Sequence, residues 1–184
     1  MDIIIFSEEN MFVTRRIKPS SKDIRKIKKL YIEAFPENER FSFSMMIKNE
    51  SGNYETFGFY QNGDFCGFAI LLNSLDISHI IYFATLPELR GKGLGAKALA
   101  AMGRIKAGKR IIVDIEREVP GNPENEIRKR RKNFYLRNGY KETEVRYRWQ
   151  EEAYEILVFG GELSREDFGN FWKALGINKN TSDG

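Results

Sequence analysis

Apolar residues recur along the chain with two different periods, which predict strands and helices in alternation. The clearest strand pair covers residues 54–60 and 65–72, which are rich in aromatic and aliphatic residues and enclose Asn62-Gly63. Asn-Gly favours the backbone angles of a two-residue hairpin turn, so these segments predict a β-hairpin. Residues 3–6 predict an extra strand or an arm. Similar apolar content predicts strands in five further segments, namely 12–18, 78–86, 110–116, 141–150 and 154–160.

Helical spacing marks the segments between these strands. Ser20-Ser21 offers an N-cap for a first helix, which Phe35-Pro36 ends. Apolar residues recur in this helix at intervals of three and four, at Ile24, Ile27, Leu30, Tyr31 and Ala34. A short helix is predicted near residues 44–48. Three longer helices are also predicted, one ending near residue 106, one at 124–138 and one after the candidate N-cap Ser164.

This order of elements predicts a mixed α/β (α+β) fold, in which a central mixed β-sheet carries helices on both faces. A length of 184 residues suits a single domain. We expect one domain over residues 1–184, with a core at about 12–160, an N-terminal arm at 1–10 and a C-terminal helix at 164–176. No apolar run approaches the roughly 20 residues that cross a bilayer, and the first residues lack the pattern of a secretory signal. A cytoplasmic location is therefore expected.

A glycine-rich segment joins the strand predicted at 78–86 to the helix that follows it. Gly91, Gly93 and Gly95 alternate in this segment. Glycines allow positive φ angles and a close approach of the backbone to a ligand, while the first turn of a helix offers unpaired N–H groups. Strand, glycine turn and helix in this order predict a phosphate-binding loop.

Spacing separates three known kinds of phosphate loop. The NTPase loop ends in Gly-Lys-Ser/Thr, whereas Gly95 is followed by Ala96-Lys97, so this kind is excluded. A dinucleotide fingerprint is compatible with the glycines but is the weaker match, because no βαβ unit with an acidic strand end follows at the required distance. The third pattern, Arg-X-X-Gly-X-Gly after a turn that contains proline, is matched by residues 90–95 with Pro87 before them.

Composition restricts the chemistry further. Thirty basic residues against 26 acidic ones give a net charge of +4, which permits an anionic ligand without favouring nucleic acid. The single cysteine, Cys66, excludes an internal disulfide and is expected to be a small buried hydrophobe. The single histidine, His79, is expected to be structural. We therefore expect no metal site.

A second motif lies at residues 133–140, where the pair Phe134-Tyr135 on a predicted helix is followed by Gly139 and Tyr140. This motif and the loop at 90–95 together resemble the two signatures of the GNAT superfamily of N-acetyltransferases, whose loop binds the pyrophosphate of acetyl-CoA. The resemblance covers about residues 12–160 and is to a bacterial branch of that superfamily. It implies a GNAT-like acyl-CoA N-acyltransferase fold, in which the fourth and fifth strands splay to leave a slot for the pantetheine arm.

The resemblance also implies which residues bind acetyl-CoA. They are Phe83, Ala84 and Thr85 on the strand edge, Arg90, Gly91, Lys92, Gly93, Leu94, Gly95 and Ala96 in the loop, and Asn133 in the second motif. A backbone N–H at the strand edge would polarise the acetyl carbonyl. Where the family often has asparagine seven residues before the tyrosine, this chain has Arg128. The basic run at 128–132 is expected to be a solvated face, with one or two cations reaching the CoA phosphates.

Catalytic roles follow from the same resemblance. Tyr135 matches the residue that donates a proton to the departing thiolate, and the alternative is a core aromatic beside Phe134. Asp114 and Glu116 alternate along an otherwise apolar strand and therefore share one face. Either residue is a candidate for the base that takes the amine proton through water. The alternative is that both carboxylates have a structural role only.

The implied function is an acetyl-CoA-dependent N-acetyltransferase, with acetyl-CoA as co-substrate and direct transfer in a ternary complex. The first two helices, the loop from Pro36 to Phe43 and the Glu151-Glu152 turn should select the acceptor. The glutamates of this region, Glu37, Glu39, Glu151 and Glu152, favour a small amine or a peptide N-terminus. We expect a monomer or homodimer without membrane or nucleic-acid partners. One rival is a non-catalytic acyl-CoA-binding module of the same fold. The other is a nucleic-acid-binding protein, which would need a continuous basic surface.

Overall fold

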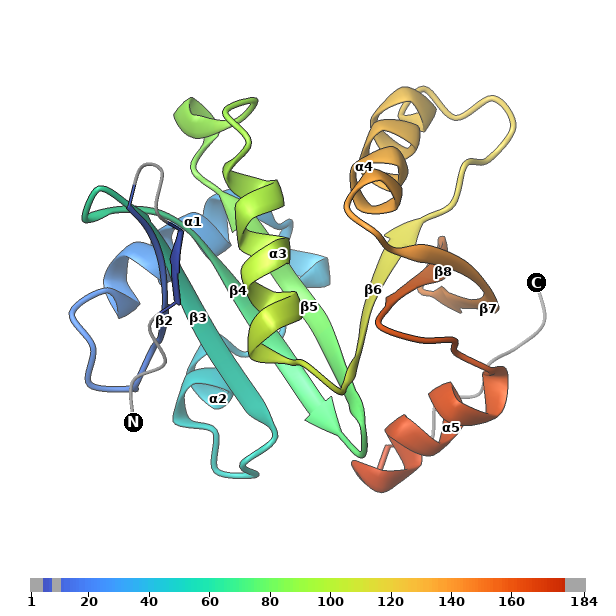
Figure 1. Cartoon of the computed structure of the whole chain (residues 1–184). Coiled ribbons are helices and arrows are strands. Elements are labelled where there is room, and N and C mark those ends of the chain that lie inside the picture. Colours follow the sequence, from blue (N-terminus) through green and yellow to red (C-terminus); the bar gives the residue numbers. More distant parts are fainter. Residues whose placement is uncertain (1–4, 8–10, 178–184) are drawn as a thin grey trace. The chain divides into compact units, whose positions relative to one another are not determined.

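The computed structural model describes residues 5–7 and 11–177 (Figure 1). The strands are β1 (Ile5–Ser7), β2 (Phe12–Arg16), β3 (Tyr54–Gln61), β4 (Asp64–Ser74), β5 (Ile77–Thr85), β6 (Arg110–Glu116), β7 (Lys141–Trp149) and β8 (Glu152–Phe159). The α-helices are α1 (Ile24–Ala34), α2 (Phe43–Lys48), α3 (Leu94–Ile105), α4 (Asn125–Arg137) and α5 (Arg165–Ala174). Two short 3-10 helices are η1 (Glu37–Glu39) and η2 (Pro87–Leu89). The fold is mixed α/β, as the sequence predicts.

The chain forms two compact units that share strand β5. The first unit contains residues up to 73 and residues 80–105, and the second contains residues 74–79 and those from 106 onward. Strand β5 therefore begins in the second unit and ends in the first.

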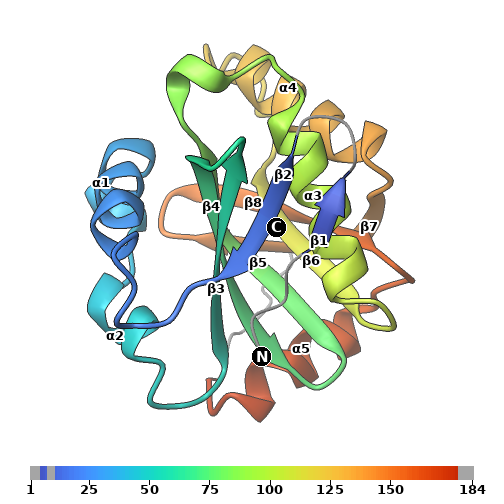
Figure 2. The same cartoon turned by 60° about the vertical axis from the view of Figure 1, so that its left-hand side comes forward.

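In the first unit the strand order is β1-β2-β3-β4-β5, and the β1–β2, β2–β3 and β3–β4 pairs are antiparallel. Helices α1 and α2 cover one face of these strands and α3 covers the opposite face (Figures 1 and 2). The core beneath α1 and α2 includes Ile27, Leu30, Met46, Phe68 and Ile70, each at most 1% exposed. Burial of such side chains is the main favourable contribution to folding.

Two local sequence signals form the elements they predict. Asn62 and Gly63 have φ angles of 54° and 91°, so both central residues of the β3–β4 turn are left-handed, as this hairpin turn requires. Ser164 caps α5 in a reciprocal capping box with Asp167. The extra strand is also present as β1, which pairs with β2, while residues 3 and 4 of that prediction lie outside the described residues.

The predicted N-cap of the first helix is wrong. Helix α1 begins at Ile24, and its N-cap residue Asp23 makes no capping hydrogen bond through its side chain. The Ser21 hydroxyl instead accepts a hydrogen bond from the Asp23 N–H at 3.3 Å, and the Ser21 N–H donates to the Lys18 carbonyl. The two serines thus form a turn before the helix, which is the competing use of a serine hydroxyl near backbone N–H groups.

In the second unit, β6 pairs with β8 and β8 pairs with β7, both in antiparallel register. Helix α5 supplies Phe168, Phe171 and Trp172 to the core of this unit. No helix within the described ranges is long and apolar enough to span a membrane.

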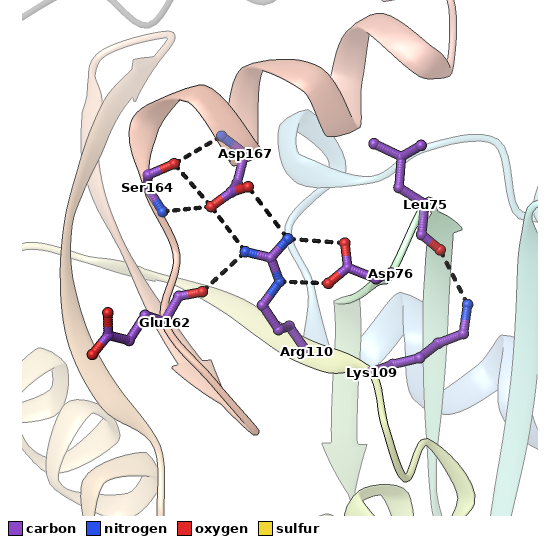
Figure 3. A network of polar contacts seen from close by, with 7 residues as sticks. All are labelled: Leu75, Asp76, Lys109, Arg110, Glu162, Ser164 and Asp167. Carbon is purple, nitrogen blue, oxygen red and sulfur yellow. Dashed lines mark hydrogen bonds and ion pairs between the residues drawn. The ribbon is translucent and has the colours of Figure 1, made fainter.

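Arg110 at the start of β6 joins three segments of the second unit (Figure 3). Its guanidinium binds Asp76 in a bidentate manner at 2.7 and 2.8 Å, and it binds Asp167 of α5 at 2.9 Å. It also donates to the Glu162 carbonyl at 3.0 Å. Hydrogen bonding to Arg110 is the main cause that lowers the pKa of both aspartates, with further lowering at Asp167 from Ser164. Arg110 therefore fixes the N-terminal end of α5 to β6 and to the turn before β5.

We predict that Arg110→Met lowers the free energy of unfolding by about 1–2 kcal/mol at pH 7, a modest amount because both aspartates are partly exposed. Since the folded-state pKa values of Asp76 and Asp167 are lowered, this stabilisation is complete above about pH 4 and is lost as the pH falls below it. Denaturant unfolding at several pH values measures the difference, which should shrink in acid. Arg104→Met is the control, and an equal loss in both variants would contradict the role of Arg110.

Candidate functional site

The glycine-rich loop joins the end of β5 to the start of α3 in the first unit. Gly91 and Gly93 adopt left-handed backbone angles, with φ of 76° and 77°. Helix α3 begins at Leu94, and the Lys97 N–H donates to the Gly93 carbonyl at 3.1 Å. The N–H groups of residues 94–96 precede this bond and therefore have no acceptor inside the helix. Such an arrangement can bind an anion at the N-terminus of α3.

Cations accompany this loop. Arg90 and Lys92 are exposed, and neither forms an ion pair within residues 5–7 and 11–177. A pocket of about 430 Å³ lies beside the loop, and Lys92, Lys97 and Cys66 are among the residues that line it. Burial raises the pKa of the Cys66 thiol to about 11, so the thiol stays protonated near neutral pH. Cys66 is thus the buried, unreactive residue that the sequence predicts.

The end of β5 is held by close packing in the first unit. Ala84 is buried, and Phe83 and Thr85 are half-buried. The Phe83 ring meets the Phe59 ring edge-on at 5.9 Å. A Cβ at Gly67 of β4 would lie 2.5 Å from the Ala84 carbonyl oxygen, so only glycine allows this approach. Nothing near Gly67 in the sequence marks this position, because the requirement arises from the neighbouring strand.

Two tyrosine hydroxyls hold the loop between α1 and α2, residues 35–42: Tyr82 attaches it to β5 and Tyr31 attaches it to α1. The Tyr82 hydroxyl accepts a hydrogen bond from the Phe41 N–H and donates to the Glu39 carbonyl, both at 2.8 Å. The Tyr31 hydroxyl donates to the Phe41 carbonyl, also at 2.8 Å. The rings of Tyr31 and Tyr82 pack edge to face at 4.8 Å. The backbone of this loop is therefore fixed beside the strand that leads into the glycine loop.

Asp114 lies in the second unit and is held by two donors. His79 Nε2 is 2.7 Å from one carboxylate oxygen, and the Tyr147 hydroxyl donates to the other. His79 is only 2% exposed, and its ring packs edge-on against the rings of Phe171 and Trp172 of α5. Burial and then the charge of Asp114 raise the pKa of Tyr147, so this hydroxyl stays protonated. Asp114 is thus part of a buried polar cluster.

Glu116 lies on the same face of β6 as Asp114, as the alternation predicts: both are half-buried, and Ile115 between them is buried. Its carboxylate pairs with Arg131 of α4, and both side chains remain partly exposed. Each of the two candidate bases therefore has a partner of its own within the second unit. Of the two, Glu116 has the more exposed partner, because the Arg131 side chain is 47% exposed and that of His79 only 2%. An exposed ion pair is weak, so solvent can compete with Arg131 for Glu116.

Tyr135 on α4 is 6% exposed and packs against Phe134 and Tyr140, with ring centroids 5.2 and 5.3 Å away. Its hydroxyl makes no hydrogen bond within the part of the chain that the structure describes. Burial is the main cause that raises the pKa of Tyr135, and the charges of Asp114 and Glu116 raise it further. The hydroxyl is therefore protonated, as a proton donor must be before it acts.

The basic run at 128–132 is not the solvated face that the sequence predicts. Arg128 is 4% exposed, donates to the Arg117 carbonyl at 2.7 Å and pairs with Glu152 at 2.9 Å. Lys132 pairs with Glu142 and Glu155, each at 3.0 Å, and Arg131 pairs with Glu116. Lys129 and Arg130 are exposed and form no ion pair among the described residues, and the neighbouring Asn133 is exposed as well. Acidic partners from distant segments explain the difference.

Metal ligands do not gather in the described residues: no group of three or more histidine, cysteine, aspartate or glutamate side chains there is close enough to hold an ion.

Comparison with known proteins defines the class. Residues 52–142 match the family described as an acetyltransferase (GNAT) domain. A GNAT-family protein from Bacteroides thetaiotaomicron has a solved structure with a TM-score of 0.72 and 22% sequence identity, over 85% of this chain and 92% of that one. No curated protein matches the chain. Residues 52–142 are thus identified as a GNAT acetyltransferase domain, and the chain shares the fold of solved GNAT proteins.

Two further solved structures share this fold. The ribosomal-protein-S18-alanine N-acetyltransferase of Escherichia coli has a TM-score of 0.57 and 19% identity, over 85% of this chain and 98% of that one. A GNAT acetyltransferase of Elizabethkingia anophelis, solved with acetyl-CoA bound, has a TM-score of 0.57 and 13% identity, over 84% of this chain and 100% of that one. At these identities the similarity concerns the fold.

We predict that Gly93→Val abolishes binding of CoA, measured by calorimetry. Valine is strained at a φ of 77°, and its side chain would occupy the space next to the backbone N–H groups that face the ligand. Gly52→Val is the matched control, because Gly52 has a φ of 75° and open space around it but lies away from the loop. Both variants should lose about 1–2 kcal/mol of stability. Unchanged CoA affinity in a folded Gly93→Val protein would refute the assignment.

A second prediction compares how much Asp114 and Glu116 contribute to the free energy of unfolding. Asp114→Asn should lower the free energy of unfolding by about 1–3 kcal/mol, because it disturbs a buried cluster with two donors. Glu116→Gln should lower it by less than about 1 kcal/mol, because its pair with Arg131 is partly exposed. Denaturant unfolding measures both, and equal losses would show that Asp114 has no special structural role.

Proposed function

We propose that this protein is an N-acetyltransferase that transfers the acetyl group of acetyl-CoA to a primary amine by direct attack in a ternary complex. The observation that carries the proposal is the loop from Arg90 to Ala96, where two left-handed glycines lead into the N-terminus of α3 beside unpaired cations. This loop suits a pyrophosphate, and the GNAT acetyltransferase domain at residues 52–142 supports acetyl-CoA as its source. The solved relative with bound acetyl-CoA supports the same co-substrate.

The reaction needs two proton movements. The amine nitrogen attacks the thioester carbonyl, the carbon–sulfur bond breaks, the new amide nitrogen loses a proton and the departing thiolate gains one. A backbone N–H at the end of β5, in residues 83–85, would polarise the carbonyl and stabilise the oxyanion, a contribution on the order of 3 kcal/mol. We assign Tyr135 as the donor of the proton that the departing thiolate gains, because the Tyr135 hydroxyl is protonated and makes no hydrogen bond within the described chain.

We assign the role of general base to Glu116, which would remove the proton of the amine through a water molecule. Asp114 accepts hydrogen bonds from His79 and Tyr147 on both of its oxygens, so it is less available as a base. Glu116 has one partly exposed arginine partner, which solvent and substrate can compete with. Asp114 then serves to order the strand that carries Glu116.

A second candidate function is a non-catalytic acyl-CoA-binding module of the same fold. The pairing of both carboxylates favours it, because a binding module needs no free base. This candidate keeps the glycine loop and has no use for the hydroxyl of Tyr135.

Tyr135→Phe separates the two candidates. The ring and its packing remain while the proton donor is lost, so turnover should fall by about 100-fold or more, with acetyl-CoA affinity within a few-fold of wild type. Turnover is measured by thiol release against a panel of amines, and affinity by calorimetry.

Tyr140→Phe is the matched control from the same aromatic cluster. The Tyr140 hydroxyl is buried without a hydrogen-bond partner among the described residues, so its removal should leave both turnover and stability unchanged. Equal turnover in Tyr135→Phe and wild type would make Tyr135 a packing residue. Acetyl-CoA binding by a wild-type protein that acetylates no amine would favour the binding module.

A further inference from the structure

Arg40 stands in the middle of the loop that Tyr31 and Tyr82 hold against β5. Its neighbours Glu39 and Phe41 are bound through their backbone groups to the Tyr82 hydroxyl, each at 2.8 Å. The Arg40 N–H itself donates to the Glu37 carbonyl at 3.2 Å. The backbone on both sides of Arg40 is therefore fixed, and the base of its side chain has a defined position in the first unit.

The guanidinium of Arg40 lacks a partner. Its Nε is buried with no hydrogen-bond acceptor, and within residues 5–7 and 11–177 the side chain forms no ion pair. The Nε of Arg128 is also buried without an acceptor, but Arg128 forms an ion pair with Glu152, as Arg110 does with Asp76 and Asp167. Arg40 as a whole is half-buried, so its guanidinium combines one buried N–H that has no acceptor with N–H groups that a ligand can reach. A buried donor without an acceptor is unfavourable and calls for an explanation.

The location of this charge is also defined. The Tyr31 hydroxyl donates to the carbonyl of Phe41, the residue next to Arg40, at 2.8 Å. Burial is the main cause that raises the pKa of Tyr31, and the positive charge of Arg40 opposes that rise. Tyr31 packs against Tyr82 of β5, and Tyr82 directly precedes Phe83, where the proposed thioester site begins. The unpaired cation therefore lies in the loop attached to the strand that would carry the reacting group.

We propose that Arg40 binds a carboxylate of the acyl acceptor, so that the acceptor is an amino acid. This proposal rests on the proposed acetyltransferase function. A planar guanidinium with free N–H groups matches a carboxylate in a bidentate manner. Glu37 and Glu39 in the same short segment oppose a phosphate dianion but suit the ammonium group of a zwitterion. The fixed backbone gives the pair a preorganised geometry.

The test compares three forms of the same acceptor: amino acids such as L-leucine and L-phenylalanine, their α-amides and the corresponding decarboxylated amines. Thiol release from acetyl-CoA gives kcat and KM for each. Wild type should use the amino acids with a kcat/KM at least about 100-fold above the amides and amines. Without carboxylate binding the amides would be preferred, because their less basic nitrogen is more often unprotonated at neutral pH.

Arg40→Met should lower kcat/KM for the amino acids by about 100-fold, mainly through KM, and leave the amides unchanged. Arg40→Lys keeps the charge but lacks the planar guanidinium, so its kcat/KM for the amino acids should lie between those of wild type and Arg40→Met. Arg25→Met on α1, an exposed arginine without an ion pair among the described residues, is the control and should match wild type. Thermal unfolding of Arg40→Met should occur at or above the wild-type temperature, whereas a structural role would lower it.

The outcomes distinguish this proposal from the proposed function. Acetylation of amines and amides as efficient as that of amino acids, or a stronger preference for phosphate-bearing amines, would overturn the role of Arg40 and leave the acetyltransferase intact. If no amine is acetylated, calorimetry measures the binding of L-leucine and L-leucinamide to the acetyl-CoA complexes of wild type and Arg40→Met. This comparison tests the carboxylate site without turnover. Weaker binding of leucine alone by Arg40→Met supports the carboxylate site, and equal or absent binding in both proteins refutes it.

Discussion

The left-handed backbone at Gly91 and Gly93 is the constraint on which the candidate site depends. Strand β5 ends at Thr85 and α3 begins at Leu94, so the chain must change direction within a few residues. Positive φ angles at the two glycines allow the turn, and they bring the backbone into α3, whose first N–H groups have no acceptor inside the helix. A residue with a side chain would strain the turn and cover those groups at the same time. The same two glycines therefore allow the turn and leave the N-terminus of α3 uncovered.

Features that depend on nearby residues were predictable from the sequence. The Asn62-Gly63 turn, the N-cap at Ser164 and the glycine turn before α3 are each specified within about six residues, so their residue types are sufficient. The alternation of Asp114 and Glu116 on one face of β6 was predictable for the same reason. The N-cap at Ser20-Ser21 was not, because the same hydroxyl can serve a turn or a cap.

Features that depend on distant residues were not predictable. Nothing near Arg128 in the sequence indicates that Glu152 will pair with it, and nothing near Asp114 indicates His79 and Tyr147. These contacts change the chemistry of the site, since a carboxylate with two donors behaves differently from a solvated one. The attachment of Glu39 and Phe41 to Tyr82 is similar, because it joins residues about 40 positions apart in the chain.

The close approach of Gly67 to Ala84 has a consequence for how the sequence can vary. Among glycines with left-handed angles, such as Gly52 and Gly121, a side chain would enter open space, and the strain it brings is limited to one residue. At Gly67 even a methyl group would overlap a neighbouring backbone oxygen, so the smallest possible substitution already displaces strand β5. Random mutagenesis under selection for activity should therefore leave position 67 almost invariant and accept several residue types at 52. A strand interior, where substitution is usually judged by hydrophobicity, is here restricted by volume alone.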